Sequence, residues 1–399
     1  MDESTRKAVE LIRSIGKEFL RPLGLEADRS GRAIPADHPF YQLVASSGFM
    51  QRGIGSEYVA NGLEKPTSHR PHSSFTNSTW ARNVLVAEEG SYWDRGALVS
   101  LPGPGLGGPP VLQMGTPSQK ERFLSIFKQK DRPLWAAFAM TEPSAGSDVA
   151  QIKTLARPDG DEWVLNGQKM FSSNSSRAEW VVVFASIDPS LGRLGHRAFV
   201  VERSFSGFEI VRIEHKMGIR AYETASFVLE NCRVPAENML GGEEYYNNKN
   251  KGGFTAAMST FNATRPIVAA MGVGIARAAY DIARKYIIEE YPAHSLHRMR
   301  RARERLVEMQ RQIANSRLLC LHAASLLDMG RPNALAASAA KQYSPPACLG
   351  VVQSAMDILG EAGITQNSLL EKLARDVKAI DIVEGTQQIQ RRIVAKYIL

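Results

Sequence analysis

The chain has 399 residues and a net charge of +8, with 44% hydrophobic and 23% charged residues. This length predicts two or three domains, and the composition is that of an ordinary globular protein with a large core. No apolar run reaches the ~18–20 residues that a membrane span needs, and no secretory signal pattern opens the chain. We therefore expect a cytoplasmic protein with no membrane partner.

The three cysteines, Cys232, Cys320 and Cys348, lie far apart and do not have the spacing of metal ligands. We interpret them as structural thiols of a reducing compartment, and we expect no metal site.

Part of the positive charge is concentrated between Arg298 and Arg305. A solvated helix face explains such a run, and so does a binding site for an anionic ligand, such as the phosphates of a cofactor or an acidic carrier protein. The run has no interleaved aromatic residues and no recognisable nucleic-acid module. We therefore expect no nucleic-acid partner.

Residues 1–135 have a mainly helical pattern. Helical spacing of apolar residues predicts a helix over 4–20, and a second helix is expected over 80–92, after a loop-rich stretch at 61–79. The Gly- and Pro-rich segment 101–110 cannot be a helix interior. Thr116 followed by Pro117 predicts the start of the next helix.

Residues 136–245 have the pattern of a compact β domain. Apolar, β-branched runs at 180–185, 198–201 and 225–229 predict strands separated by turns. The pair Asn166-Gly167, directly after a short apolar run, predicts a hairpin turn.

Residues 246–399 return to helical patterns, and small residues such as Gly272 and Gly274 allow helices to approach closely. Gly330, before Arg331-Pro332, predicts the end of a helix. No GxGxxG motif follows a strand, so a Rossmann-type dinucleotide site is not expected. Helices are predicted over 256–286, 306–328 and 345–359.

The segment Ala139–Asp148 (AMTEPSAGSD) predicts a tight polar turn that leaves a strand. Gly146 permits close backbone approach, while Thr141, Ser147 and Asp148 offer polar partners. This combination suits binding of the polar edge of a flat ligand, although an ordinary capped turn has much the same pattern.

The segment Asp381–Arg391 (DIVEGTQQIQR) places one carboxylate, Glu384, beside a glycine. Flanking Ile382 and Val383 would partly desolvate this carboxylate, which raises its pKa and makes it a candidate general base. A helix-capping glutamate is the alternative interpretation.

A third segment, Asn166–Asn174 (NGQKMFSSN), lies between these two. In their order along the chain, the three segments resemble the "MTEPxAGSD", "NGxKxWITN" and "YEGTxxIQ" motifs of the acyl-CoA dehydrogenase family. The resemblance runs from about Met114 to Leu399, with a looser match before it. It implies an α+β multidomain fold: an N-terminal helical domain (1–135), a central β-sandwich or barrel-like domain (136–245) and a C-terminal four-helix bundle (246–399) that contains Glu384.

The resemblance also implies FAD as the cofactor. The segment 138–147 would line the flavin ring, with Ser147 on a flavin phosphate or on the substrate. Phe171, where the family usually has Trp, and Ser173 would cover the opposite face of the ring. The implied cofactor-binding residues are Phe138, Met140, Thr141, Gly146, Ser147, Phe171, Ser173, Gly360, Gly363, Thr386 and Gln388.

For catalysis, the resemblance implies that Glu384 removes the α-proton of an acyl thioester. Phe261–Pro266 (FNATRP) is similar to the family's "FDxxRP" helix, so Asn262 and Arg265 would lie at the substrate. A structural salt bridge is the alternative role for Arg265. Some family members carry the base on this helix; the corresponding residue is expected to be Ala263, which cannot act as a base.

Several positions depart from the family pattern. The family's "RxxFG" arginine, which binds the FAD diphosphate of a neighbouring subunit, has no counterpart in Glu289–His294. The family's "QxxGGxGY" element reads Asp357–Ile364 (DILGEAGI), in which acids, Asp357 and Glu361, replace the glutamine and one glycine. An acid near the diphosphate needs a compensating cation, and the run from Arg298 is a candidate. Phe138 and Val383 replace tyrosines, and segment 56–79 lacks the family pattern. These changes indicate a specialised member.

The leading hypothesis is dehydrogenation of an acyl thioester carried on CoA or on an acyl-carrier protein, with an electron-transfer flavoprotein or another acceptor. A flavin monooxygenase or N-oxidase on the same scaffold is the second hypothesis, and Glu384 argues against it. A non-catalytic partner subunit without FAD is the third. Because the family's FAD site is shared between subunits, we expect a homodimer or homotetramer.

Overall fold

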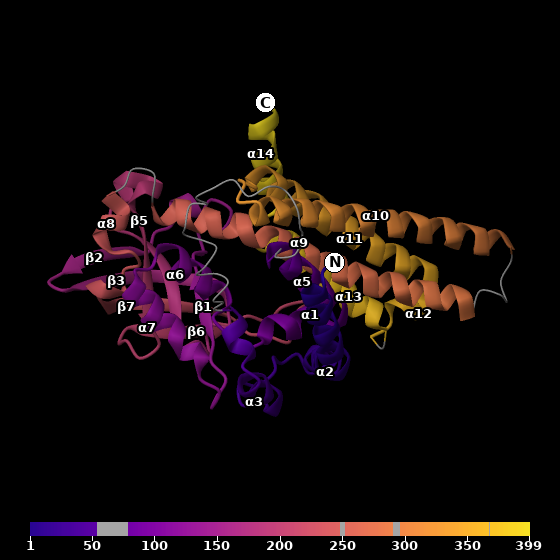
Figure 1. Cartoon of the computed structure of the whole chain (residues 1–399), viewed down its shortest axis with the longest axis horizontal. Helices are drawn as coiled ribbons and strands as arrows, with labels where there is room; N and C mark the ends of the chain where they lie inside the picture. Colours follow the sequence, from indigo (N-terminus) through magenta and orange to yellow (C-terminus); the bar gives the residue numbers. More distant parts are fainter. Residues whose placement is uncertain (54–78, 248–251, 290–295, 367) are drawn as a thin grey trace.

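The computed structural model describes residues 1–53, 79–247, 252–289, 296–366 and 368–399. The strands gather at one end of the molecule, and the long helices α9 (Gly253–Glu289), α10 (Leu296–Asp328) and α11 (Ala334–Leu359) extend toward the other end (Figure 1). N-terminal helices, a central β half-barrel and a C-terminal helical domain follow one another, which confirms the predicted fold class. The expected loop at 61–78 and the departure at 290–294 lie outside the described residues.

The N-terminal part is helical, as predicted. α1 and α2 are joined by a π-helical turn, Gly16–Leu20, so the helix expected to end at residue 20 continues to Ser30. Helix α5 (Thr79–Ser100) bends at Asp94, whose φ of −164° is not helical. The helices are α1 (Glu3–Ile15), α2 (Arg21–Ser30), α3 (Pro39–Ser46), α5 (Thr79–Ser100), α6 (Gly108–Met114) and α7 (Pro117–Leu124).

The capping signals of this part are confirmed. Thr116 and Gln119 form a reciprocal capping box at the start of α7, with Pro117 in the first turn. In the Gly- and Pro-rich segment, the two prolines Pro109 and Pro110 lie in the first turn of α6, where a missing N–H costs nothing.

The strands form one curved sheet with the order β1-β4-β2-β3-β7-β6, and β5 pairs with β4. β4 pairs in parallel with β1 and antiparallel with β5, so the most buried strand lies centrally. The strands are β1 (Ala136–Ala139), β2 (Leu155–Asp159), β3 (Glu162–Ser173), β4 (Trp180–Ser186), β5 (His196–Glu202), β6 (Phe208–Ile213) and β7 (Thr224–Pro235).

The hairpin predicted at Asn166-Gly167 is wrong, because β3 continues through these residues. The side chain of Asn166 exchanges hydrogen bonds with Asn231 of β7, and the pairing shifts register there. A Cβ atom on Gly167 would lie 2.5 Å from Thr154 Oγ1. The glycine is therefore present for a close strand approach, and the turn that joins β2 to β3 lies at Gly160.

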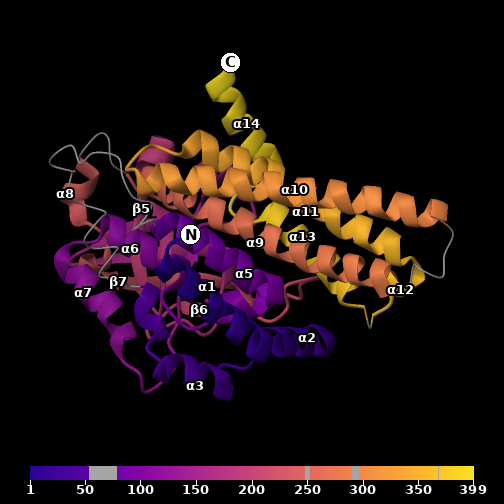
Figure 2. The ribbon, with the colours of Figure 1, turned by 45° about the vertical axis from the view of Figure 1, so that its right-hand side comes forward.

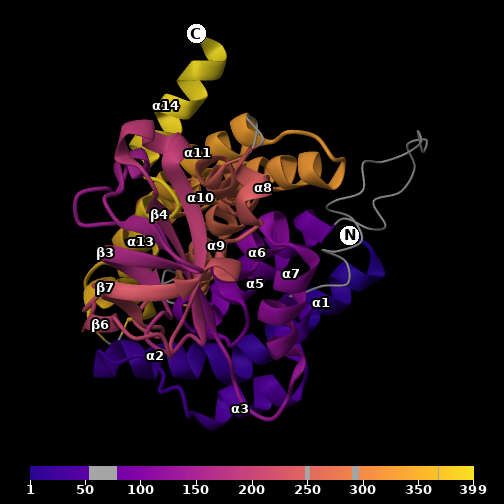
Figure 3. The ribbon, with the colours of Figure 1, turned by 90° about the vertical axis from the view of Figure 1, so that its left-hand side faces the viewer.

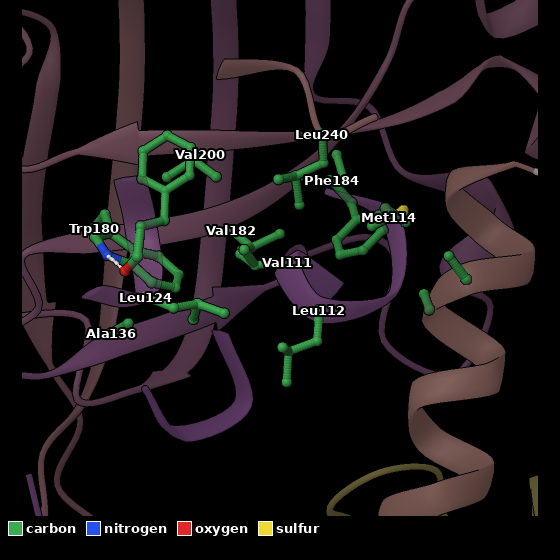
Figure 4. Packing of buried hydrophobic residues seen from close by; sticks show 14 of the residues in the cluster. Val111, Leu112, Met114, Leu124, Ala136, Trp180, Val182, Phe184, Val200 and Leu240 are labelled. Carbon is green, nitrogen blue, oxygen red and sulfur yellow. Dashed lines mark hydrogen bonds between the residues drawn. The ribbon is translucent and has the colours of Figure 1, made fainter. Parts of the chain in front are cut away.

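Both faces of β4 are buried. Alternate residues point to opposite sides of a strand. Val182 and Phe184 therefore pack with α6 and α7, which cover one side of the strands (Figures 3 and 4), while Val181 and Val183 pack with Phe199 on the other side. The sheet has a helix-covered core and an internal core, as expected for a half-barrel.

The C-terminal helices form a bundle. α10 and α11 run beside α9 (Figure 2), and α13 packs against α9 and α11. α10 ends before Gly330, as predicted, and α11 begins earlier than expected and contains Pro345 and Pro346. The helices are α8 (Gly242–Asn247), α9 (Gly253–Glu289), α10 (Leu296–Asp328), α11 (Ala334–Leu359), α12 (Glu361–Ile364), α13 (Leu369–Ile382) and α14 (Gln387–Ile398).

α9 is also the one described helix that has the length and composition of a membrane span. In its most apolar window, 67% of the residues are buried inside the protein, and α5, α10 and α11 surround it. This burial is that of a core helix.

α5 and α9 pack closely enough to join the two helical parts of the molecule. A Cβ atom on Gly274 would lie 2.1 Å from the carbonyl oxygen of Glu88, so the predicted role of this small residue is confirmed. The buried Glu88 carboxylate accepts hydrogen bonds from Arg277 of α9 (2.9 Å) and Arg317 of α10 (2.6 Å). One carboxylate thus links three helices.

A second buried cluster joins α13 to the bend in α5. The Lys372 ammonium lies 2.6 Å from Asp94 Oδ2 and 2.5 Å from Asp376 Oδ2, and all three side chains are at most 4% exposed. Asp94 also accepts from the N–H of Ala97, which caps the second half of α5. The bend in α5 and the position of α13 therefore depend on the same ion cluster.

We expect Lys372→Met to destabilise the fold by about 3–5 kcal/mol, because it leaves two buried carboxylates without a cation. The midpoint of urea unfolding measures this loss. Glu3→Gln, which removes the exposed pair with Lys7, is the control and should change the midpoint little. Equal midpoints for Lys372→Met and the unmodified protein would contradict the structural role of the cluster.

Candidate active site

Glu384 lies on a short turn between the end of α13 and the start of α14. Its φ is 56°, in the left-handed region that residues with a Cβ atom rarely adopt, and Gly385 follows with a φ of 99°. Such backbone strain persists only where the surroundings enforce it. The turn is therefore a place where the fold holds one side chain in a costly position.

Three buried side chains bind the carbonyl groups of this turn. Arg265 Nε of α9 donates to Glu384 O (3.1 Å), and Lys341 Nζ of α11 donates to Gly385 O (3.2 Å). Gln390 Nε2 of α14 donates to the same two carbonyls at 3.4 and 3.3 Å. The turn is thus fixed from three helices, through its backbone.

The Glu384 carboxylate itself has a different partner. Thr264 Oγ1 of α9 lies 2.7 Å from Glu384 Oε2 and donates to it. Burial raises the pKa of Glu384 above its usual value, against the opposing effects of the Thr264 hydrogen bond and the charges of Arg265, Lys341 and Arg95. Ile382 is 57% exposed, so the packed helices desolvate the carboxylate rather than this neighbour.

Thr264 was missed by the sequence analysis, which considered Ala263 as the helix position opposite the base. The signal was a hydroxyl side chain directly before Arg265 in the FNATRP segment. The structure places the Thr264 hydroxyl on the carboxylate, and neither residue has a group that can replace the glutamate as a base.

Asn262 and Arg265 act together. Arg265 Nη1 donates to Asn262 Oδ1 (2.8 Å), one turn earlier on α9. Among the described residues, no carboxylate lies within salt-bridge distance of Arg265, so the alternative of a structural salt bridge is wrong for this part of the chain. In the structure Arg265 binds the Glu384 carbonyl and Asn262 binds Arg265; their expected place at the substrate stays a prediction.

The expected ring-binding segment leaves β1 and faces α9. The Phe138 ring is half-buried between Phe184 (ring centroids 5.1 Å apart) and Phe261 of α9 (5.5 Å). Met140 is buried, Thr141 is half-buried, and Gly146 and Ser147 are exposed. The segment therefore offers an apolar edge and exposed polar groups, and Phe138 connects it to the helix that carries Thr264 and Arg265.

Phe171 stands on a bulge of β3, where the pairing with β7 shifts register between Lys169 and Ser172. Its φ is 57°, and its side chain is 56% exposed. Ser172 Oγ donates to Phe138 O (2.9 Å), so the bulge is attached to the first segment. Ser173 follows, half-buried, at the end of the strand. An exposed aromatic ring on a strained bulge fits contact with a flat ligand.

Lys169 and Glu142 form a buried ion pair that the sequence analysis did not identify, although both residues lie in the quoted motifs. Lys169 Nζ donates to Glu142 Oε1 (2.7 Å) and to Met140 O (3.2 Å). Burial lowers the pKa of Lys169 to about 8, against the effect of Glu142. The other Glu142 bonds go to Lys153 N and Thr154. The pair joins the two ring-binding segments below their surface.

Thr386 and Gln388 follow Glu384 on α14. The Thr386 hydroxyl accepts from Ile389 N (3.5 Å) as the helix cap, and Gln388 is exposed in the first turn. Both residues follow Glu384 closely in the chain, and the side chain of Gln388 is accessible to a ligand.

Gly360 and Gly363 lie elsewhere. Gly360 is the N-cap of α12 and Gly363 lies within it, at the end of α11 that points away from the strands (Figure 1). Gly360 is about 28 Å from Lys341 along α11 at the helical rise. Asp357, the acid expected to need a cation, pairs with Arg305 of the basic run (3.4 Å). The structure therefore does not bring these glycines to the ring-binding segments of the same chain.

We expect Glu384→Gln to stabilise the ligand-free protein at neutral pH. Because the pKa of Glu384 is raised on folding, the folded state binds its proton more tightly than the unfolded state. The ionised carboxylate therefore costs stability above the folded pKa, and this cost disappears below the unfolded value of about 4.3. A thermal midpoint about 2 °C higher at pH 7 is expected.

The same comparison at pH 4 should show no gain. Glu308→Gln, on the exposed face of α10, serves as control and should not raise the midpoint at either pH. A Glu384→Gln midpoint at or below that of the unmodified protein at pH 7 would mean that the site does not desolvate the carboxylate.

Comparison with known proteins shows the family of the chain. The family model for the acyl-CoA dehydrogenase C-terminal domain matches residues 251–399, and the model for the acyl-CoA dehydrogenase middle domain matches residues 137–232. The chain is 32% identical to a 3-(aryl)acrylate reductase of Clostridium sporogenes over 98% of both chains. It is 29% identical to a short-chain specific acyl-CoA dehydrogenase of Clostridium acetobutylicum over 99% of both.

Solved structures show the same relationship. Butyryl-CoA dehydrogenase of Megasphaera elsdenii superposes with a TM-score of 0.86 at 29% identity, covering 100% of this chain and 98% of that one. A prolyl acyl carrier protein oxidase has a TM-score of 0.84 at 25% identity, covering 100% and 99%. The chain belongs to the acyl-CoA dehydrogenase family, whose members are FAD-using oxidoreductases that dehydrogenate acyl thioesters.

Proposed function

We propose that this protein uses FAD to dehydrogenate an acyl thioester between Cα and Cβ, with Glu384 as the base that removes the α-proton. The observation that carries the proposal is the Glu384 turn: a carboxylate with a raised pKa, on a strained backbone held by Arg265, Lys341 and Gln390. A base with a pKa nearer the working pH is the group that such a weak carbon acid needs.

The chain contributes positioning and charge control. Glu384 takes the proton, and its backbone N–H is proposed to donate to the thioester carbonyl as negative charge develops there. Phe138 of β1 and Phe261 of α9 are in contact. This contact keeps the proposed ring-binding segments at a fixed position relative to Glu384. FAD, when bound, supplies the acceptor for the hydride that leaves Cβ.

The described residues fit the ring end of FAD. Phe171 and Ser173 on one segment and Phe138 to Ser147 on the other offer an exposed aromatic ring, hydroxyls and backbone groups. Since Gly360 and Gly363 lie far from these segments in one chain, we propose that they bind the diphosphate end of an FAD that a second copy holds by its ring. A homodimer is the smallest assembly with complete sites.

The carrier of the acyl group and the electron acceptor belong to the proposal. The exposed arginines at the start of α10 suit the phosphates of CoA or an acidic acyl-carrier protein, and an electron-transfer flavoprotein is the proposed acceptor. Two relatives are named as an arylacrylate reductase and a prolyl acyl carrier protein oxidase. The substrates to be tested are therefore straight-chain, arylpropionyl and prolyl thioesters, each on CoA and on an acyl-carrier protein.

We expect anaerobic mixing of the flavin-loaded protein with the right thioester to bleach the flavin absorbance. Glu384→Gln should slow bleaching by at least about 10³-fold, because the amide cannot accept the proton, while the bound flavin remains. Glu308→Gln is the matched control and should bleach at the normal rate.

Three outcomes would contradict this assignment. Bleaching of Glu384→Gln at the normal rate would mean that another group is the base. Substrate oxygenation by reduced flavin and O₂ would support a monooxygenase, and a purified protein that cannot bind flavin would support a non-catalytic subunit.

We expect Lys169→Met to weaken FAD binding about tenfold, or about 1.4 kcal/mol. The change leaves Glu142 buried without its cation, so the segment from Met140 to Ser147 loses one of its contacts with β3. Titration of the apoprotein with FAD, followed by flavin fluorescence, measures the dissociation constant. Lys153→Met, at an exposed lysine of the same region, is the control; equal constants for both variants would exclude this positioning role.

A further inference from the structure

The groups around Glu384 bind different parts of the residue: some bind the backbone carbonyls of its turn, and a different one binds its carboxylate. Arg265, Lys341 and Gln390 all donate, and their hydrogen bonds to the turn go to backbone carbonyls. Within the part of the chain that the structure describes, the one side-chain hydrogen bond to the carboxylate oxygens comes from the Thr264 hydroxyl. An ammonium or guanidinium group can only donate, whereas a hydroxyl can donate and accept.

The Thr264 hydroxyl also has a second hydrogen-bond acceptor within reach. Oγ1 lies 2.7 Å from Glu384 Oε2 and 3.2 Å from the carbonyl oxygen of Thr260, one turn earlier on α9. A hydroxyl carries a single proton and rotates freely about its C–O bond. It can therefore serve one of these two acceptors at a time, and the distances make the carboxylate the preferred one while it is ionised.

We propose that Thr264 is the positioning residue of the base: its hydroxyl donates to the Glu384 carboxylate before proton abstraction and, turned toward Thr260 O, accepts from the carboxylic acid afterwards. The inference deepens the proposed function and depends on it for the reaction step. In that step one O–H bond forms at Glu384 as one Cα–H bond of the thioester breaks. Thr264 keeps its own proton throughout.

The need for such a partner follows from the charges that face the carboxylate. Arg265 of α9, Lys341 of α11 and Arg95 of α5 all favour its ionised form, and Asp381 on its own segment pairs with Lys378. None of the three cations can accept a hydrogen bond from the protonated acid. Without Thr264, the acid formed in the reaction would lose the one side-chain hydroxyl that the described part of the chain places on it.

Thr264→Val and Thr264→Ser separate the effect of the hydroxyl group from the effect of the side-chain volume. Valine keeps the branched volume without the hydroxyl, and serine keeps the hydroxyl. In the ligand-free protein, a pH titration of the carbonyl stretch of protonated Glu384 by infrared difference spectroscopy gives the midpoint of the base. The band is assigned by its loss in Glu384→Gln, and the thermal midpoint of each variant verifies its fold.

A hydrogen bond to an ionised carboxylate is worth more than one from the neutral acid, so the loss of both should favour the acid. We therefore expect Thr264→Val to move the titration midpoint upward by about one pH unit and to shift the carbonyl band, while Thr264→Ser matches the unmodified protein. The acid limb of flavin reduction should move by the same amount. An unchanged midpoint and band in Thr264→Val would overturn the inference. If no thioester reduces the flavin of the unmodified protein, the proposed function fails, but the infrared midpoints still decide the role of Thr264.

Discussion

A strained turn that is fixed through its own carbonyl groups is the constraint on which the active site depends. Glu384 keeps a left-handed backbone because buried donors from α9, α11 and α14 bind the carbonyls of the turn. This arrangement leaves the carboxylate free of permanent cation contacts. A base that formed a direct ion pair would be held equally well but would have a lowered pKa and little basicity.

Helix α9 carries most of the parts that meet there. Within a little more than one turn it presents Phe261 to the β domain, Asn262 and Arg265 to the turn, and Thr264 to the carboxylate. Further along, Gly274 brings the same helix against α5. Any displacement of α9 would thus act at once on the sheet, on Glu384 and on the N-terminal helices.

The sequence predicted the order of the domains well, because hydrophobic periodicity and capping signals such as Thr116-Pro117 are local. It also singled out Glu384, whose motif is local too. It failed at Asn166-Gly167, where a close tertiary approach to Thr154, and not a turn, requires the glycine. Motif matching alone identified Gly360 and Gly363 as cofactor residues, and this stays a prediction. The sequence did not show that the length of α11 separates them from the other expected cofactor residues of the same chain.

Contacts between distant segments were the other limit of prediction. Thr264, Lys341 and Lys169 act through partners that are 120, 44 and 27 positions away in the chain. A single sequence does not distinguish a buried lysine from an exposed one, because both can occupy the same kind of position in a helix or strand pattern. Only the packing of the elements shows which lysines lie inside.

The burial of these lysines also has a chemical consequence. Thioesters acylate free amines, and an enzyme of this family is exposed to thioesters as its substrates. Lys169, Lys341 and Lys372 are at most 3% exposed and hydrogen-bonded to carbonyls or carboxylates, so the structure shields the amines that it depends on from reaction with its own class of substrate. Lys7 and Lys285, on the surface, are open to that adventitious modification, and neither belongs to the active site.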